Sequence, residues 1–334
     1  MTKWIDCSGP DEDVVISSRI RLARNIENIP FPIALTDKSQ QQVYDEINKN
    51  IGEDPYELKL MKEMTDEDKC ILVEKHLISP SLVESSYGGV LLNQDQSISV
   101  MINEEDHIRI QSILPGFQLD DTYELADKTD DKLESNIRYS YDERLGYLTS
   151  CPTNVGTGMR ASVMVHLPGI TITDYISRVF QAANQMGLAI RGIYGEGTKF
   201  LGNIYQISNQ LTLGRSEKEI IENLKHVTRQ IIEKERNIRK QLLQDNKIQL
   251  EDKIYRSLGI LTHARVLQEV ECMKLISNLR LGVFLDIIKD IDSSLINKMI
   301  IMTQTPYIKT LINTEDINLI NTKRSEIVRN LLRT

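Results

Sequence analysis

The sequence predicts a mixed fold of strands and helices, followed by a separate helical region. Residues 89–103 are typical of a hairpin, because Val90–Leu92 and Ile98–Ile102 flank a polar turn. Asn203–Leu213 is also typical of a strand, with Ile, Tyr and Thr interleaved with polar residues. From Lys253 to the end the chain is nearly glycine-free and its Leu and Ile residues recur at helical spacing. This pattern predicts a helical domain that begins near 245–255.

The composition excludes several classes of protein. The 334 residues are enough for one large domain and a smaller one. A net charge of -8 argues against a general binder of nucleic acid or of anionic membranes. No apolar run approaches a membrane span, and the amino-terminal residues do not resemble a secretion signal. The four cysteines are widely spaced without a zinc pattern, so we expect free thiols, no metal site and a cytoplasmic location.

Arginines dominate the segment after the short β-rich run Val14–Ile16. Arg19 and Arg21 are two residues apart, so they share one face if the strand continues, whereas Arg24 cannot share it. Two neighbouring guanidinium groups would form a clamp for a phosphate. The alternative interpretation is a solvated basic patch.

Two further candidates lie between residues 37 and 144. Residues 37–70 are polar and mostly helical in composition, and 116–144 are acidic and compatible with helices. His76 lies near an apolar patch, where a histidine is more often structural than catalytic. The second hairpin strand runs into residues 103–109 (NEEDHIR), which hold three acids, a histidine and an arginine. This cluster is either a solvated acidic turn or a general base with its orienting partners.

Residues 146–168 combine a thiol, a glycine-containing turn and an arginine. We expect Tyr147–Ser150 to form a short buried strand that ends at Cys151, because a proline follows. After the turn, an apolar helix is expected to begin at Met159 and to be stopped by Pro168. The arginine in its first turn would be unfavourable unless an anion faces it. The stretch therefore predicts an active site that handles an anion.

The chain then alternates between helices, strands and a glycine-rich loop. A helix is expected over 172–186 and a strand over 188–193. Residues 192–198 hold three glycines and one acid, a composition that lets a ligand approach the backbone. A capping box at 216–219 predicts a long amphipathic helix that continues to about Leu243.

Common nucleotide-binding signatures are absent from the sequence. It has no GxxxxGK[ST] motif and no HRD or DFG triplet. Gly156–Ala161 fits the loose G-x-G-x-x-A dinucleotide pattern, but a Cys-Pro pair precedes it. The only acid about 20 residues further on is Asp174, at an expected helix start. A nicotinamide-dependent enzyme is therefore a poor fit.

Four segments resemble, in order, the motifs of the phosphagen kinase (ATP:guanidino phosphotransferase) family. They are SSRIRLARN, NEEDHIRI, LTSCPTNVGTGMRASV and the pair RGIYGEG and GNIYQISNQLTLG, and they span roughly residues 14–215. Within the family the chain most resembles the bacterial protein arginine kinases. The resemblance implies an α+β catalytic domain with an antiparallel sheet flanked by helices, followed by a small all-α C-terminal domain. The implied division is a lead over 1–13, the catalytic domain over 14–245 and the helical domain over 246–334.

The resemblance also implies that ATP binds, with Mg²⁺ held by phosphate oxygens and water. Guanidinium groups around a triphosphate neutralise its charge and align the γ-phosphoryl group. The family's phosphate-binding arginines correspond to Arg19, Arg21, Arg109, Arg160 and Arg191, and a nucleotide-contacting histidine corresponds to His76. The other residues expected at the nucleotide are Ser17, Ser18, Ile20, Ala161, Ser162, Val163, Met164, Gly192, Ile193, Tyr194 and Gly195.

Three catalytic residues follow from the same resemblance. Glu105 and Glu196 correspond to paired carboxylates that grip the acceptor guanidinium, and we favour Glu105 as the general base. Cys151 corresponds to a reactive cysteine. The hydroxyl of Thr153 and the expected helix start would favour its thiolate, which would face the guanidinium.

The implied reaction is transfer of the ATP γ-phosphoryl group to arginine side chains of proteins. Family members carry a small helical domain before the first arginine motif, whereas 13 residues precede Val14 here. A site without that domain would be open enough for an arginine on a protein surface. The resemblance further implies a homodimer, a role in stress response, and three partners: a zinc-binding activator, a Clp-type protease and a heat-shock repressor.

Two alternatives remain from the sequence. One is a kinase of free arginine or another small guanidino compound. The other is a non-catalytic adaptor or repressor-binding module on a degraded kinase fold, although every catalytic position that we map is filled. The resemblance is incomplete near the end of the chain. Protein arginine kinases often carry an RDxxRA motif for phosphoarginine, and residues 320–325 (INTKRS) keep only Arg324.

Overall fold

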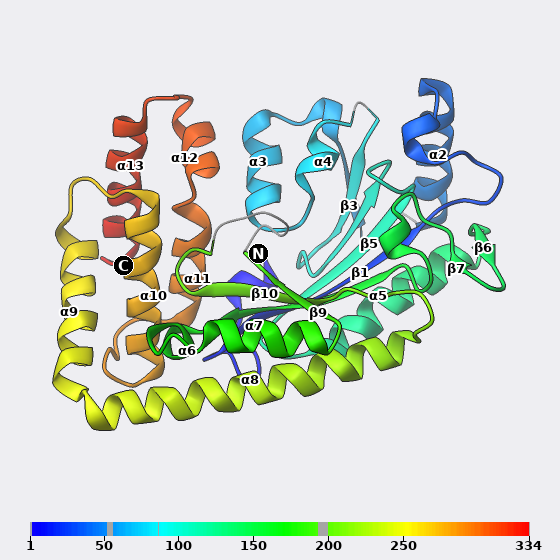
Figure 1. The fold of residues 1–334 in the computed structure, drawn as a ribbon. Helices are drawn as coiled ribbons and strands as arrows, with labels where there is room; N and C mark the ends of the chain where they lie inside the picture. Colours follow the sequence, from blue (N-terminus) through cyan, green and yellow to red (C-terminus); the bar gives the residue numbers. More distant parts are fainter. Residues whose placement is uncertain (1, 52–55, 86, 193–199, 334) are drawn as a thin grey trace.

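The computed structural model describes residues 2–51, 56–85, 87–192 and 200–333. Its centre is an eight-stranded antiparallel sheet in the order β2-β3-β4-β5-β1-β8-β10-β9 (Figure 1). Its strands are β1 (Val15–Arg24), β2 (Tyr56–Leu60), β3 (Gly89–Asn93), β4 (Ile98–Ile102), β5 (Ile108–Pro115), β8 (Met159–His166), β9 (Leu188–Arg191) and β10 (Ile204–Asn209). The predicted α+β class with an antiparallel sheet is confirmed.

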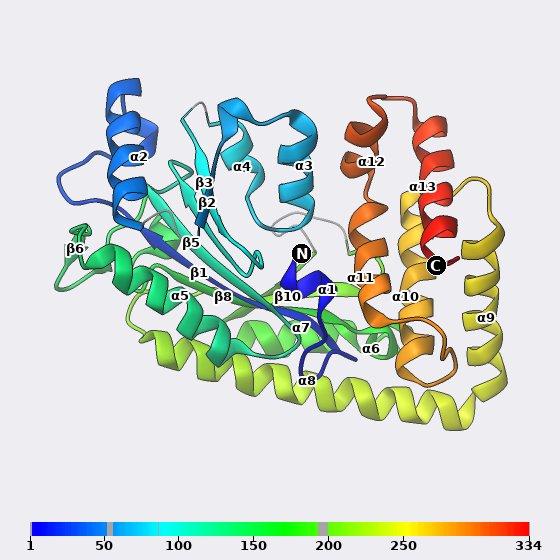
Figure 2. The same ribbon diagram turned by 180° about the vertical axis from the view of Figure 1, so that it is seen from behind.

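Helices cover both faces of this sheet. Helices α5, α7 and α8 pack against one face, and α3 and α4 lie on the other side (Figures 1 and 2). None of the described helices is both long and apolar enough to cross a membrane. The helices that precede the carboxyl-terminal region are α1 (Lys3–Asp6), α2 (Asp37–Ile51), α3 (Asp66–Glu74), α4 (Pro80–Val83), α5 (Leu119–Glu134), α6 (Pro168–Ile172), α7 (Ile176–Gln185) and α8 (Glu217–Asp245).

A helical region follows the sheet, as the sequence predicts. It packs beside the sheet at the far end of α8 (Figure 1). Met273, Ile276 and Leu279 of this region form an apolar cluster with Ile113 and Met164 of the sheet. The helices of this region are α9 (Lys247–His263), α10 (Glu269–Phe284), α11 (Ser293–Met302), α12 (Thr305–Ile312) and α13 (Ile317–Leu331).

Strand β8 corrects the prediction of a helix at this position. Met159–His166 is a strand between β1 and β10, and Pro168 begins α6 rather than ending a helix. A central strand buried on both faces shows the same apolar run as a buried helix, so periodicity cannot separate them. The strand expected at Tyr147–Ser150 is also wrong. Only Gly146–Tyr147 is extended (β7), and it pairs with β6 (Tyr141–Asp142) in a separate two-stranded sheet.

Several local predictions are confirmed and two need revision. Strands β3 and β4 form the expected hairpin, and Ser216 and Glu219 form a full capping box at the start of α8. The helix expected over 172–186 is divided into α6 and α7, with Asp174 between them in a left-handed conformation (φ 55°). Strand β2 lies within the stretch 37–70 that was expected to be mostly helical, because it completes the edge beside β3.

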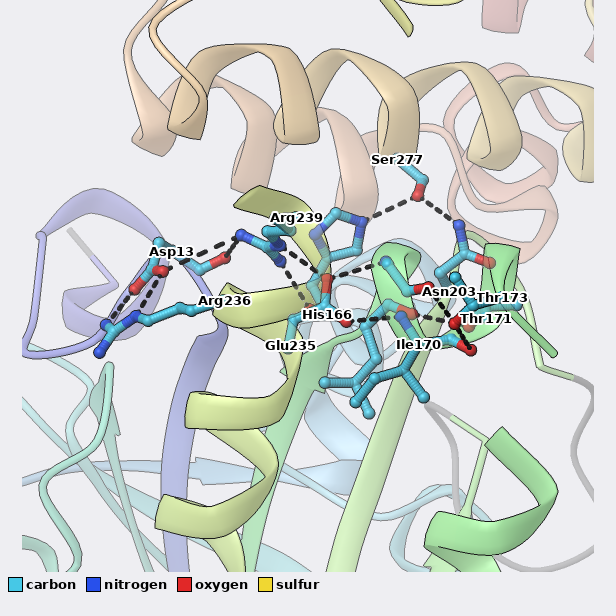
Figure 3. Close-up of polar contacts among 12 residues, drawn as sticks. Asp13, His166, Ile170, Thr171, Thr173, Asn203, Glu235, Arg236, Arg239 and Ser277 are labelled. Carbon is cyan, nitrogen blue, oxygen red and sulfur yellow. Dashed lines mark hydrogen bonds and ion pairs between the residues drawn. The ribbon is translucent and has the colours of Figure 1, made fainter. Parts of the chain in front are cut away.

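A buried polar network joins the sheet to the helical region (Figure 3). The Glu235 carboxylate accepts the Gly169 and Ile170 amides, both at 2.8 Å, and the Arg239 Nε at 2.6 Å. On the other side, Ser277 of α10 lies 2.8 Å from the His166 Nε2 and accepts the Asn203 Nδ2 at 2.8 Å. Because hydrogen bonds between buried polar groups are costly to break, this network fixes the helical region against the end of β8.

Candidate active site

The register of the central strands places all five predicted phosphate-binding arginines on one face of the sheet. Arg21 of β1 lies opposite Gln111 of β5 and Arg160 of β8. Directly opposed residues in an antiparallel pair point to the same side, as do residues two apart in one strand. Arg19 and Arg109 are therefore on this face as well, and Arg191 joins it opposite Gln206. We call it the arginine face.

The arginine face forms the floor of a cavity of about 630 Å³. The segment after α3, helix α4 and the acidic turn after β4 complete its walls. The cavity is thus a basic floor with two glutamates at one side, large enough for a nucleotide. The lining residues besides the five arginines are Val73, His76, Ile78, Ser79, Pro80, Ser81, Met101, Glu104, Glu105, Gln111 and Gln206.

Positive charge is concentrated on this floor. Burial, followed by repulsion from the neighbouring Arg109 and Arg160, lowers the pKa of Arg19 to about 10. Burial, followed by repulsion from Arg19, Arg109 and Arg160, also holds the pKa of Arg21 well below its usual value. Within the described part of the chain, the buried Arg21 Nε has no hydrogen-bond partner. Such a cluster of cations is stabilised by a polyanion.

The two adjacent glutamates at the cavity wall differ in state. The Arg109 Nη1 donates to both oxygens of Glu104, at 2.7 and 2.6 Å, and Ser79 donates to the same carboxylate at 2.5 Å. Burial alone would raise the pKa of Glu104, but Arg109 and Ser79 lower it below the usual value. Glu104 is therefore a fixed anion that orients Arg109.

The pKa of Glu105 is shifted in the opposite direction. Its side chain is exposed at the cavity mouth, and partial burial followed by the Asp106 charge raises its pKa. Asp106 itself is 1% exposed and accepts the Asn25 Nδ2 and the Ser150 amide, both at 2.7 Å. A carboxylate with a raised pKa and an open side chain is suited to accept a proton.

A second cavity of about 390 Å³ shares Glu104 and Glu105 with the first. Its rim includes Ile33, which is 96% exposed in the short 3-10 helix Pro32–Ala34. The shared carboxylates place Glu105 between the basic cavity and a surface opening. The other lining residues are Pro32, Gln40, Ser85, Asn103 and Ser150.

Cys151 directly follows Ser150 of this second cavity. Its Sγ lies 3.0 Å from the Thr153 Oγ1, so the predicted contact between thiol and hydroxyl is present. The residue precedes a single 3-10 turn, Pro152–Asn154, and not the α-helix expected after Gly158. An α-helix start at Met159 therefore does not stabilise the Cys151 thiolate.

Other predicted nucleotide residues are divided between the two faces of the sheet. Ser17, Ser162 and Met164 share the arginine face, whereas Ile20 belongs to the opposite apolar core. Ser18, Ala161 and Val163 also point away from the cavity, and none of the three is among the residues that line it. Gly192 directly follows β9. Ile193, Tyr194, Gly195 and the catalytic candidate Glu196 lie outside the described residues.

Two glutamines on the arginine face were not among the predicted site residues. Gln111 lies two residues after Arg109, and the Gln206 Oε1 accepts the Arg19 Nη2 at 2.5 Å. The available signal was the alternation of residues along β5 and β10. Both glutamines lie at positions that alternate with residues facing the apolar core.

Arg324, the remaining residue of the RDxxRA-like tail, is fully buried. Its guanidinium donates to the carbonyls of Thr303 (2.7 Å) and Leu267 (2.8 Å), and to the Thr305 hydroxyl (2.7 Å). These bonds hold α13 against the start of α12. Binding of a phosphoarginine through this side chain would require breaking them.

Comparisons with known proteins agree with the geometry. Residues 38–238 match the family model "ATP:guanido phosphotransferase, C-terminal catalytic domain", and residues 247–334 match "Protein-arginine kinase McsB C-terminal domain". The protein-arginine kinase of Bacillus subtilis (strain 168) is 47% identical over 315 residues, which cover 92% of this chain and 87% of the relative. That of Bacillus pumilus (strain SAFR-032) is 47% identical over 347 residues, covering 100% and 94%.

Solved structures of two other kinases share the fold. A lombricine kinase has a TM-score of 0.60 with 28% identity over 67% of each chain. The duplicated taurocyamine kinase from Schistosoma mansoni with bound transition state analog components has a TM-score of 0.61 and 25% identity, over 76% of this chain and 39% of that chain. The arginine face, the adjoining glutamates and these similarities lead to one conclusion: the chain belongs to the ATP:guanido phosphotransferase family and, within it, to the protein-arginine kinases.

Proposed function

We propose that the arginine face holds the ATP phosphates, that Glu105 is the general base, and that the acceptor arginine of a protein substrate reaches it through the second cavity. The observation that carries this proposal is the position of Glu105, which lines both cavities. Mg²⁺ enters as part of the Mg-ATP substrate, held by phosphate oxygens and water.

The arginine face stabilises the charge of phosphoryl transfer. Arg21 and Arg160 are opposed across β1 and β8, and Arg19 lies two residues away. Guanidinium groups on rigid neighbouring strands can align the γ-phosphoryl group and neutralise its oxygens without a later rearrangement. Arg109 is held by Glu104 at 2.6 Å, so it too is positioned before the nucleotide binds.

Glu105 acts on the acceptor guanidinium. An arginine side chain stays protonated near neutral pH and is a poor nucleophile until it loses a proton. In the proposed step a guanidinium nitrogen forms the N–P bond, the bond from the γ-phosphorus to the ADP oxygen breaks, and the nitrogen's proton moves to the Glu105 carboxylate. Cys151, and Glu196 outside the described residues, would orient the remaining guanidinium nitrogens.

The second cavity suits a protein substrate. It opens to the surface beside Ile33, which offers an apolar contact to residues that flank the acceptor arginine. Physiologically, we propose phosphorylation of damaged or regulatory proteins in protein quality control and the stress response. A zinc-binding activator, a Clp-type protease, a heat-shock repressor and homodimer formation through the helical domain (246–334) belong to the same proposal.

The test is incubation with Mg-ATP and an arginine-rich unfolded protein, followed by phosphosite mass spectrometry without acid, because the P–N bond is acid-labile. Phosphate on protein arginines that is lost in Glu105→Gln is the expected result. Transfer to free arginine but not to protein would contradict the proposed substrate. Undiminished transfer by Glu105→Gln would refute the assignment of the base.

A further inference from the structure

Trp4 is the only tryptophan of the chain, and the proposed mechanism does not use it. It lies in α1 and is 2% exposed. The indole Nε1 donates to the Lys75 carbonyl at 3.0 Å, and the indole ring centre is 5.7 Å from the ring centre of His76. Trp4 therefore contacts both the backbone before His76 and the His76 ring, while His76 lines the nucleotide cavity.

His76 has a backbone conformation that needs support. Its φ of 57° lies in the left-handed region, which is unfavourable for a residue other than glycine. The His76 amide donates to the Val73 carbonyl at 2.8 Å, and its carbonyl accepts the Gln111 Nε2 at 2.7 Å. Trp4 adds a contact to the Lys75 carbonyl and to the His76 ring. The Lys75–His76 segment is thus held between α1 and the arginine face.

The His76 ring is neutral in this setting. Burial, followed by the positive charges of Arg19 and Arg21, lowers its pKa to about 3. A neutral imidazole beside a basic floor can stack on or hydrogen-bond to a nucleotide without adding to the repulsion among the arginines. Its value to the site depends on where the ring is held.

Helix α1 is itself anchored at two points. The Lys3 amide donates to the Asp95 carbonyl at 3.0 Å, and their side chains form an ion pair at 3.2 Å. Asp6 pairs with Lys298 of α11 at 3.2 Å. Trp4 also belongs to the apolar cluster of Met164, Met273 and their neighbours, which continues the arginine face into the helical region. Its position is therefore fixed from the sheet and from the helical region together.

We propose that Trp4 is a positioning residue of the nucleotide site, which holds His76 against the cavity and thereby raises the affinity for a purine nucleoside triphosphate. The inference rests on the proposed nucleotide role of His76. Trp4 does not line the cavity, so its effect must pass through His76. The contribution should then disappear when the His76 side chain is absent.

A double-mutant cycle on the full chain tests this inference, with calorimetric titration of the Mg-bound, non-hydrolysable ATP analogue AMP-PNP. Trp4→Ala is expected to weaken binding about tenfold, within the range of coupling between contacting residues. His76→Ala should weaken it at least as much, and the double variant no more than His76→Ala alone. In kinetics, Trp4→Ala should raise the KM for ATP and leave kcat at saturating ATP unchanged.

The possible outcomes distinguish the positioning role of Trp4 from the nucleotide role of His76. Additive losses, or wild-type affinity in Trp4→Ala beside weakened binding in His76→Ala, would overturn the inference alone. Wild-type affinity in His76→Ala would instead refute the nucleotide role of His76. Ile320→Ala is the matched control, because Ile320 is fully buried in a separate cluster with Ile308 and Ile327. It should keep wild-type affinity.

Tryptophan fluorescence of chains that keep Trp4 covers the case in which Trp4→Ala does not fold. Because there is one tryptophan, its emission reports on Trp4 alone. Saturating Mg-AMP-PNP should change the emission in a saturable way, and His76→Ala should abolish the change at the same site occupancy. Emission that does not respond to bound nucleotide, or an equal response in His76→Ala, would contradict the inference.

Discussion

Arg24 and Arg21 belong to the same strand but point to opposite faces of the sheet. Arg24 pairs with Asp130 at 2.6 Å, and its guanidinium carbon lies 3.6 Å from the centre of the Tyr147 ring. Burial alone would lower the pKa of Arg24, but Asp130, Tyr147 and Glu217 raise it above its usual value. Arg21 is only partly buried, and burial together with the neighbouring arginines lowers its pKa. Arg24 is paired with an anion of the fold, whereas Arg21 has no ion pair among the described residues, and we expect a ligand to supply its counter-charge.

The same contrast separates two adjacent glutamates. Glu104 is matched by Arg109 and has a lowered pKa, whereas Glu105 stands beside Asp106 and has a raised one. Charged groups that have an oppositely charged partner in the fold stabilise the protein. Charged groups that lack such a partner are the candidates for reacting groups. This comparison predicts which substitutions change activity and which change stability.

The largest effect is expected for Arg21→Ala. Loss of one arginine at a transferring phosphoryl group should reduce kcat/KM by roughly 10³-fold or more. The free energy of unfolding should stay the same or increase, because repulsion with Arg19 and Arg160 is relieved. Kinase assays and thermal unfolding of the same preparation check both statements. A clear loss of stability would show that Arg21 is structural.

Arg24→Ala tests the arginine on the opposite face of the sheet. Removal of one partner from a buried ion pair leaves Asp130 uncompensated and should lower the free energy of unfolding by roughly 3–5 kcal/mol. Gly158 is tied to this site as well, since a side chain there would meet the Arg24 Nη1 at 2.8 Å. Urea unfolding measures the loss. Variant protein that remains folded should keep most of its ATP affinity, and loss of that affinity would contradict the assignment.

Glu105→Gln should reduce kcat by roughly 10²–10⁴-fold, as expected for a general base. In the wild type the base works only when ionised, so kcat/KM should fall as the pH drops through the pKa of Glu105. Because that pKa is raised, the midpoint should lie above the usual 4.5. A pH–rate profile tests the sign. An acid limb of unchanged midpoint in Glu105→Gln would exclude Glu105 as its source.

Cys151→Ser should have the smallest effect of the four. A thiolate that faces the guanidinium supplies one charge contact, and its replacement is expected to reduce kcat/KM about tenfold. The Thr153 hydroxyl remains available to a serine at this position. Steady-state kinetics with a protein substrate measures the change. Activity equal to the wild type would remove Cys151 from the site.

Strand alternation made the arginine pair predictable, because Arg19 and Arg21 share a face whatever the neighbouring strands are. The position of Arg21 opposite both Gln111 and Arg160 could not be predicted, because it depends on the register among three strands that are distant in sequence. The bond from Arg109 to Glu104 likewise needs the turn after β4 in place.

The wrong helix at Met159–His166 has a local cause. Its apolar residues form a nearly continuous run, which both a buried helix and a central strand display. Arg160 and Ser162 alternate with Ala161 and Val163, and this period of two was the signal for a strand. Once the segment is a strand, Arg160 faces the cavity by alternation and needs no helix dipole.

Nucleotide binding by the arginine face tests directly whether its cations hold ATP. Mg-AMP-PNP would be titrated calorimetrically into the wild type and into the Arg19→Ala/Arg21→Ala double variant, with unfolding of each followed in parallel. We expect saturable binding by the wild type and no measurable binding by a double variant of undiminished stability. Wild-type affinity in the folded double variant would contradict the claim that these unmatched cations exist to hold ATP.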